Sequence, residues 1–348
     1  MAEAALTPAQ SAVRLDVSDV GMVLVAQQQA RRIARLAGLD EAGAHDAALV
    51  VAELAGNAQR HGRDGQVILQ PSSDGPALDV VALDRGRGMA DWEQSSTDGY
   101  STAPGSLGAG LGAVKRVASA VTSYAEPDQG TVVSARIGPL GASELIGALG
   151  SPRRGEQVNG DAWSWWVDAS GVFAVLADGL GHGPDAAAAS ALAVADPADL
   201  AAAQLPAAVL QIHARVRGTR GAAVTAVRLR RAPGGEGHEL LAAGVGNVAA
   251  AVVAPDGSVR RTLIGHGTAG LAVRTPVETT TPVPTGSVVV LHTDGLVSSW
   301  NLQDRPRAVD ASPALLAAVL LRDQERGRDD IGIVVLRPEL PSGRRAGD

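Results

Sequence analysis

The first 137 residues alternate between helical and strand-like spacing of apolar side chains. Apolar residues recur at helical spacing over about residues 20–36 and 42–60, which predicts two helices. The runs QVILQ, ALDVVALD and GTVVSARI predict strands. A stretch rich in Gly, Ser and Thr, residues 95–112, leads into a short predicted helix from Ala113. The pattern predicts helices packed on one sheet that closes near Ile137.

The second half of the chain has a different pattern of apolar residues. Short apolar runs that predict strands recur there: AWSWWVD, VFAVLAD, AAVTAVRLR, HELLAAGV, NVAAAVVAP, SVVVLHTD and DIGIVVLR. Two alanine-rich helical segments between Pro184 and Arg217, and one near residues 313–322, interrupt them. The fold class is therefore α+β, with a second domain built as a two-sheet sandwich covered by helices.

The domain boundaries follow from this change of pattern. We expect an N-terminal domain over residues 1–138, a linker over 139–154 and a C-terminal domain over 155–338, with a flexible tail at 339–348. The segment 186–217 is almost bare of polar side chains. It is expected to pack on a partner or on the N-terminal domain.

Composition narrows the possible partners. The 348 residues carry a formal charge of −7, which disfavours binding to nucleic acid or to an anionic membrane surface. The chain has no cysteine, so a disulfide scaffold, a thiolate zinc site and a cysteine nucleophile are excluded. No apolar run approaches the ~18 residues of a membrane span, and the start MAEAALTPAQ lacks the features of a signal peptide. We therefore expect a cytoplasmic protein.

The second predicted helix carries polar residues beside its apolar stripe. Glu53, Asn57 and His61 recur every fourth residue and share one face of the helix. Burying such groups without partners costs about 1–3 kcal/mol each. They therefore face water or a ligand. His61 lies at the helix end, where capping of carbonyl groups is favoured over a catalytic role.

Two glycine-containing motifs follow this helix. Asp84 ends a predicted strand and opens DRGRGM, a turn that can aim one carboxylate into a pocket. GSLGAGLGAVKRV leads into a helix whose first N–H groups can hold phosphate. A dinucleotide-binding fold would place a buried strand directly before such glycines. The polar loop DGYSTAPGS stands there instead, and we reject that interpretation.

In this order, ELAGNAQRHG, DRGRGM and GAGLGAVKR resemble the GHKL ATPase family over about residues 10–137, in the branch of anti-sigma-factor serine kinases of the RsbW and RsbT kind. The resemblance implies a two-layer α/β sandwich that binds ATP. It implies that Asn57 binds the Mg²⁺ bridging the phosphates, that Asp84 accepts from the adenine amino group, and that Glu53 is the base for the accepting hydroxyl. The residues that would line the nucleotide are Gly86, Gly88, Gly108, Gly110, Leu111 and Gly112. Lys115, the only lysine, either contacts a phosphate or solvates its helix. No phosphoacceptor histidine helix precedes these motifs, so the expected acceptor is a serine or threonine of a partner.

Acidic residues occur at turns throughout the second half. Asp161, Asp178, Asp294 and the pair Asp329 and Asp330 stand at such turns, and most mark the point where an apolar run meets glycine or another acid. Asp-Gly is also common in the turns of β-hairpins, so any one of these acids alone would indicate only a turn. Together they can gather at one end of a sheet. Oxygen ligands select Mg²⁺ or Mn²⁺, and two such ions can share and activate a water for attack on phosphorus.

The motifs GEQVNGDAW, ADGLGHG, RGAAVTAV, AGVGN, TDGLV and RDDIGIVV resemble the metal-dependent type 2C protein phosphatases, in their SpoIIE and RsbX branch, over about residues 155–337. The resemblance implies an α/β/β/α sandwich. It implies that Asp178 bridges two metal ions, helped by the Gly179 carbonyl, and that Asp161, Asp294 and Asp329 complete the ligand set. The remaining residues of these motifs are not expected to bind metal. His182 and Asp330 are expected to hold the metal ligands in place. Gly244 and Asn247 are expected to form a tight connection between strands, and His292 is expected to lie in the core.

The favoured interpretation is a bifunctional bacterial regulator. The resemblances imply an ATP-dependent Ser/Thr kinase fused to a metal-dependent phosphatase, both acting on STAS-domain proteins of the anti-anti-sigma type in a stress or sporulation pathway. In the alternative, only the C-terminal half is catalytic, and the ATPase domain sequesters a sigma factor or activates a downstream phosphatase. A third possibility makes ATP an allosteric ligand of the phosphatase.

Overall fold

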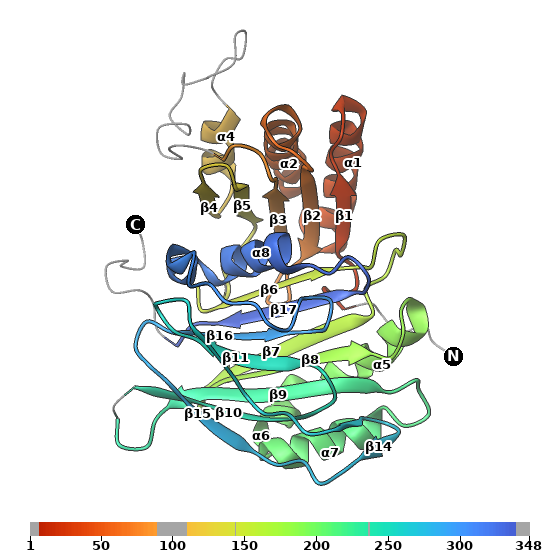
Figure 1. Ribbon diagram of the computed structural model, residues 1–348. Helices are drawn as coiled ribbons and strands as arrows, with labels where there is room; N and C mark the ends of the chain where they lie inside the picture. Colours follow the sequence, from red (N-terminus) through yellow and green to blue (C-terminus); the bar gives the residue numbers. More distant parts are fainter. Residues whose placement is uncertain (1–6, 89–109, 143, 236, 339–348) are drawn as a thin grey trace. The chain divides into compact units, whose positions relative to one another are not determined.

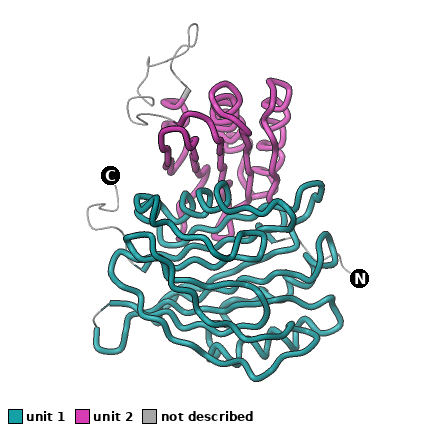
Figure 2. Tube along the Cα trace, viewed as in Figure 1, with its two compact units in different colours: residues 1–11, 143–348 teal, residues 12–142 magenta. Residues whose placement is uncertain are grey.

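The computed structural model describes residues 7–88, 110–142, 144–235 and 237–338 (Figure 1). The chain divides into two compact units (Figure 2): unit 2 holds residues 12–142, and unit 1 holds residues 1–11 together with 143–348. Unit 2 is thus inserted into the sequence of unit 1. Across the described ranges, no helix combines the length and apolar character needed to cross a membrane.

Unit 2 is one antiparallel sheet with helices packed on it, as the sequence predicts. Its strands run in the order β1 (Val13–Asp16), β2 (Gln66–Pro71), β3 (Leu78–Leu83), β5 (Gly130–Ile137) and β4 (Ala120–Glu126). Its described helices are α1 (Val20–Leu36), α2 (Glu41–His61) and α4 (Gly110–Val117). The two long helices and three strands were predicted. The short β1 and the polar β4 were missed because neither shows a strong apolar pattern.

The two long helices of unit 2 are fixed at their starts and along their inner faces. The Asp19 side chain accepts from the Met22 N–H at 3.0 Å, and Asp40 accepts from the Gly43 N–H at 2.8 Å. The buried face of α2 contains Val50, Val51 and Leu54, which join the core over the sheet. Because these apolar residues face inward, the polar residues beside them reach the edge of the helix layer.

Unit 1 is a sandwich of two antiparallel five-stranded sheets. One sheet has the order β15 (Thr279–Val283), β10 (His238–Val245), β9 (Ala222–Arg231), β8 (Gly171–Gly179) and β7 (Asp161–Asp168). The other has the order β12 (Val259–Arg261), β11 (Ala249–Val253), β16 (Val288–His292), β17 (Ile331–Leu336) and β6 (Ile146–Ser151). Helices α5 (Pro184–Val194), α6 (Pro197–Ala202) and α7 (Leu205–Arg215) cover the first sheet, and α8 (Pro313–Gln324) covers the second (Figure 1). A 3-10 turn (Pro306–Asp310) and the two-residue strands β13 (Gly267–Thr268) and β14 (Ala272–Val273) complete the unit.

Three features of unit 1 differ from the sequence-based expectation. The segment 186–217 forms three helices where two were expected. Its apolar side chains, such as Leu200, Val209 and Ile212, are buried in the core over the first sheet, so its composition reflects packing within the unit. The segment expected to be a linker contains β6, which pairs with β17 over six residues.

The third difference concerns the start of the chain. Gln10, expected to lie in the N-terminal domain, is buried in unit 1. Its Nε2 donates to the Ala187 carbonyl at 2.6 Å and to Ser190 Oγ at 3.0 Å, both on α5. These bonds satisfy a buried amide that had no recognisable signal in the sequence.

Candidate functional sites

The acids of unit 1 gather where strands of its two sheets end. β7 starts at Asp161 and β8 ends at Gly179, and the antiparallel register places Asp161 opposite Asp178. Asp294 lies two residues after β16, and Asp330 directly precedes β17. Thr293 Oγ1 donates to Asp161 Oδ2 at 2.7 Å, which joins the end of one sheet to the end of the other. These contacts place Asp161 beside Asp178 and link Asp161 to the strand end that carries Asp294.

The electrostatics of these acids confirm that their charges interact. Burial, followed by the charges of Asp294, Asp329 and Asp330, raises the pKa of Asp178 from 3.8 to about 8. Burial and the charge of Asp178 raise the pKa of the Asp161 carboxyl well above its ordinary value. The pKa values of Asp294 and Asp330 are also raised, chiefly by burial. Asp329 is exposed and lies at the mouth of the cluster.

Polar neighbours hold these acids in place, and the sequence analysis missed three of them. Asn159 is fully buried, and its Oδ1 accepts from the backbone N–H of Asp161 at 3.0 Å. Asn247 Nδ2 donates to Asp294 Oδ2 at 2.7 Å, so this residue orients an acid in addition to forming a tight connection. Thr293 is the third. Each lies within a motif already recognised, but the bond partners of Asn247 and Thr293 are far away in sequence.

Two glycines let the backbone approach the acids closely. A Cβ on Gly160 would lie 2.6 Å from Asp330 Oδ2, and a Cβ on Gly179 would collide with the Ala186 carbonyl of α5. The backbone at Gly179, the last residue of β8, therefore packs directly against α5, beside Asp178. Close packing also requires a glycine at position 244, because a Cβ on Gly244 would lie 2.7 Å from Thr225 Oγ1. That agrees with the structural role expected for Gly244.

The donor set fits a pair of hard divalent cations. All the converging side chains offer oxygen, the donor that Mg²⁺ and Mn²⁺ prefer. Asp330 Oδ1 accepts from the Arg153 N–H at 2.7 Å, whereas its Oδ2 is buried without a hydrogen bond of regular geometry. In the described part of the chain, no three acidic or histidine side chains are drawn together closely enough to hold one ion.

Two histidines of unit 1 have distinct environments. His182 lies at the rim, half exposed, with its Nδ1 2.7 Å from Glu156 Oε1. His292 is buried, as expected for a core residue, and its Nε2 accepts from Trp300 Nε1 at 3.1 Å. Burial lowers the pKa of His292, which keeps the ring neutral.

In unit 2, the predicted polar residues lie on α2 and at the end of β3, and the two elements meet where Gly62 packs against Asp84. Glu53 and Asn57 are partly buried on α2. Asn57 Oδ1 accepts from Arg60 Nη2 at 2.9 Å, which engages one of the two lone pairs of this oxygen and places a guanidinium cation beside it. Asp84 is buried at the end of β3, and its Oδ1 accepts from the Gly86 N–H at 2.7 Å. The carboxylate therefore sits in a turn that fixes its direction.

The glycines predicted to line a nucleotide have varied settings. A Cβ on Gly86 would lie 2.7 Å from the His61 carbonyl, and Gly88 has a φ of +75° and would clash with the Glu126 carbonyl, so backbone packing alone requires both. The helix starts at Gly110 and not near Ala113, which places Gly110, Leu111 and Gly112 in its first turn. The Leu111 side chain belongs to the core of unit 2. Gly108 lies outside the described residues.

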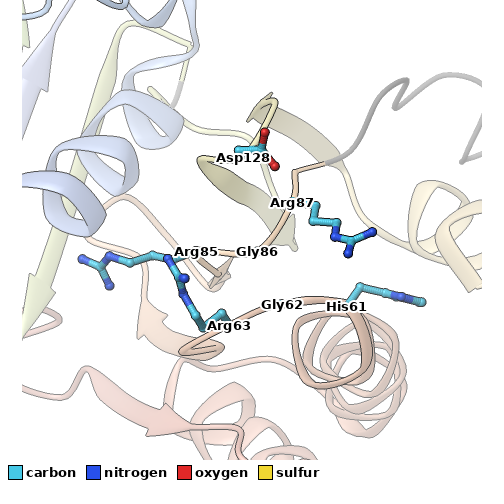
Figure 3. A pocket seen from close by; sticks show the side chains of 7 residues that line it. All are labelled: His61, Gly62, Arg63, Arg85, Gly86, Arg87 and Asp128. Atoms are coloured by element: carbon cyan, nitrogen blue, oxygen red, sulfur yellow. The ribbon is translucent and has the colours of Figure 1, made fainter.

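A pocket of about 390 Å³ opens beside this turn (Figure 3). Its described lining is His61, Gly62, Arg63, Arg85, Gly86, Arg87 and Asp128. In the view of Figure 3, the side chains of Arg63 and Arg85 extend to one side and those of Arg87 and His61 to the other. Three guanidinium groups against one carboxylate favour an anionic ligand. The sequence analysis did not single out these arginines. Lys115 is exposed on α4.

Comparison with known proteins assigns unit 2 to a family. Residues 9–137 match the sequence model of the histidine kinase-like ATPase domain. The serine/threonine-protein kinase RsbT of Bacillus subtilis (strain 168) is 30% identical over 115 residues, which cover 32% of this chain and 86% of RsbT. The chain belongs to the RsbT family of kinase-like ATPases.

Unit 1 matches a second family. Residues 168–339 match the sequence model of stage II sporulation protein E, SpoIIE. Among solved structures, a chain from the bacterial stressosome is similar with a TM-score of 0.49 and 25% identity, covering 56% of this chain and 98% of that one. RsbX in complex with magnesium is similar with a TM-score of 0.46 and 21% identity, covering 55% and 94%. The chain thus carries a match to the kinase-like ATPase model in unit 2 and a match to the SpoIIE model in unit 1.

Proposed function

We propose that this chain is a bifunctional regulator of partner switching, in which the two units act in opposite directions on one class of target. Unit 2 would transfer phosphate from ATP to a serine or threonine of a STAS-domain protein, and unit 1 would remove it by hydrolysis. The observation that carries the proposal is the set of converging carboxylates in unit 1, where Asp178 has its pKa raised to about 8. Such a set is costly to fold unless cations neutralise it.

In unit 1, Asp161, Asp178, Asp294, Asp329 and the Gly179 carbonyl would hold Mg²⁺ or Mn²⁺. When bound, these ions supply a water of lowered pKa and neutralise charge on the phosphate. The protein's own contribution is orientation. Thr293 holds Asp161 at 2.7 Å, and Asn247 holds Asp294 at the same distance, so both carboxylates keep one oxygen engaged and present the other.

In unit 2, Asp84 would accept from the adenine amino group, and the arginine-lined pocket beside it would draw the polyanion in. Asn57 would offer a neutral oxygen to Mg²⁺, and Glu53, one turn earlier on α2, would accept the proton of the attacking hydroxyl. Both side chains are only partly buried, so they remain accessible from the edge of the helix layer.

A second candidate function follows from the hydrogen bond between Arg60 and Asn57 Oδ1 at 2.9 Å. It engages one lone pair of the oxygen that Mg²⁺ would use and places a guanidinium cation next to it, and this positive charge favours a unit 2 that binds a partner without transferring phosphate. In that case the partner would be a sigma factor or a downstream phosphatase, and only unit 1 would be catalytic.

One experiment separates the two candidates. The full chain, Glu53→Gln and Asp178→Asn are each incubated with a STAS-domain protein from the same genome, ATP and Mn²⁺, and the target is examined by intact mass. Asp178→Asn should leave the target fully phosphorylated, the unmodified chain partly so, and Glu53→Gln should strip a pre-phosphorylated sample. If Asp178→Asn adds no phosphate while the unmodified chain still removes it, unit 2 is a binding module.

A further inference from the structure

Strand register places the backbone of Arg220 beside the end of β8, where Asp178 and Gly179 lie. β9 pairs with β8 so that Ala222 lies opposite Gly179, the last residue of β8. One step further, the Leu180 N–H donates to the Gly221 carbonyl at 3.0 Å. Arg220 therefore precedes β9 at the point where Asp178 and Gly179 end β8.

The Arg220 side chain is held against the loop that follows these two residues. Its Nη2 lies 2.7 Å from Asp185 Oδ2 in the first turn of α5. Its Nη1 is 3.1 Å from the place where a Cβ on Gly181 would be. The side chain is half exposed, at 50%. Ion pairs this exposed contribute only about 0–1 kcal/mol to stability, so folding alone gives little reason for the arrangement.

The chemistry of the cluster gives a stronger reason. A phosphate monoester is an anion that must approach several carboxylates, and cations bound among them would neutralise only part of the repulsion. A guanidinium offers paired N–H donors to phosphate oxygens in a fixed planar fork. We propose that Arg220 binds the phosphate group of the phosphoserine or phosphothreonine substrate at the rim of unit 1, and that Asp185 holds the guanidinium in position. This inference rests on the phosphatase activity proposed above.

The test uses the full chain with Mn²⁺, a phosphoserine peptide and p-nitrophenyl phosphate as substrates, and inorganic phosphate as inhibitor. Arg220→Ala should raise KM for both substrates and Ki for inorganic phosphate together, by about tenfold or more, the loss expected for a hydrogen bond between charged groups. The value of kcat should change far less, because Arg220 does not contact the leaving group. Arg220→Lys should recover part of the binding, and Asp185→Asn should raise the same constants by a smaller factor.

Arg217 provides the matched control. It is an exposed arginine of the same α7 to β9 connection, but its Nη2 lies 3.4 Å from His213 Nε2, away from the cluster. Arg217→Ala should leave KM and Ki unchanged. Thermal unfolding in chelator should be the same for the unmodified chain and Arg220→Ala, which shows that the variant is folded.

Three outcomes would overturn the inference. Unchanged KM and Ki in folded Arg220→Ala would remove Arg220 from phosphate binding. A rise in KM for the peptide alone, with Ki for inorganic phosphate unchanged, would assign Arg220 to the protein part of the substrate. If the unmodified chain shows no metal-dependent hydrolysis of either substrate, the proposed phosphatase function fails, and the inference fails with it.

Discussion

Replacing Asp178 by asparagine should stabilise the protein when no metal is present, although it should destroy phosphatase activity. Asp178 on β8 lies opposite Asp161 on β7, and the charges of Asp294, Asp329 and Asp330 act on its carboxyl group. Asparagine has nearly the same shape and carries no charge. The substitution therefore removes electrostatic repulsion and the cost of burying a charge, without leaving a cavity.

The size of the effect follows from the pKa of Asp178, which is raised from 3.8 to about 8 in the folded protein. An acid whose folded pKa is raised binds more protons in the folded state, so stability falls as pH rises between these two values. At pH 7 the raised pKa of Asp178 lowers the free energy of unfolding by about 4 kcal/mol, because each pH unit above 3.8 costs about 1.4 kcal/mol. Asparagine retains an amide that needs partners, so we expect a gain of about 2–4 kcal/mol at pH 7 and little at pH 4.

Urea unfolding in chelator from pH 4 to pH 8.5 measures this gain. Tryptophan fluorescence reports on unit 1, because Trp163, Trp165, Trp166 and Trp300 lie there and only Trp92 lies in the unit 2 segment. Asp256→Asn is the control: Asp256 is exposed, and hydrogen bonds from Ser258 lower the pKa of its carboxyl, so that variant should gain nothing. An Asp178→Asn variant no more stable than the unmodified chain at pH 8 would refute the repulsive cluster. Added Mn²⁺ should stabilise the unmodified chain more than the variant.

Four further outcomes are expected. Asn57→Ala and Asp84→Asn should each abolish ATP binding in calorimetry while circular dichroism stays unchanged; equal affinity in both would mean that the nucleotide binds elsewhere. Thr293→Val and Asn247→Ala should each weaken Mn²⁺ binding by about 10–100-fold, the usual effect of losing a partner of a metal ligand; unchanged titrations would remove both from the site. Chelator should stop phosphate release from a phosphoserine peptide, and Mg²⁺ or Mn²⁺ should restore it without a trapped phospho-enzyme. Gln10→Leu should cost unit 1 about 1–3 kcal/mol, because two buried hydrogen bonds, to the Ala187 carbonyl and to Ser190 Oγ, are lost, and it should leave ATP affinity unchanged; equal urea midpoints would show that the buried amide contributes nothing.

The sequence predicted those parts of the fold that depend on local pattern. Helical spacing marks α2, and an apolar run followed by Asp-Gly marks the ends of β8 and β16. What it missed depends on pairing between distant segments. Asn247 orients Asp294 only because β11 and β16 are neighbours, and the pairing of β6 with β17 cannot be read from residues 146–151 alone. A side chain's partner is set by register, and register is a property of the whole sheet.

The way the two units share one chain differs from an end-to-end fusion. Unit 2 leaves unit 1 after residue 11 and returns at residue 143, so it has two covalent attachments. A flexible linker would couple opposed activities through local concentration alone. Here the first attachment begins at Gln10, which is bonded to Ala187 on α5, and the neighbouring Ala186 carbonyl packs against Gly179 beside Asp178. The chain therefore leaves unit 1 directly after a residue that is hydrogen-bonded to α5, the helix that packs on Gly179.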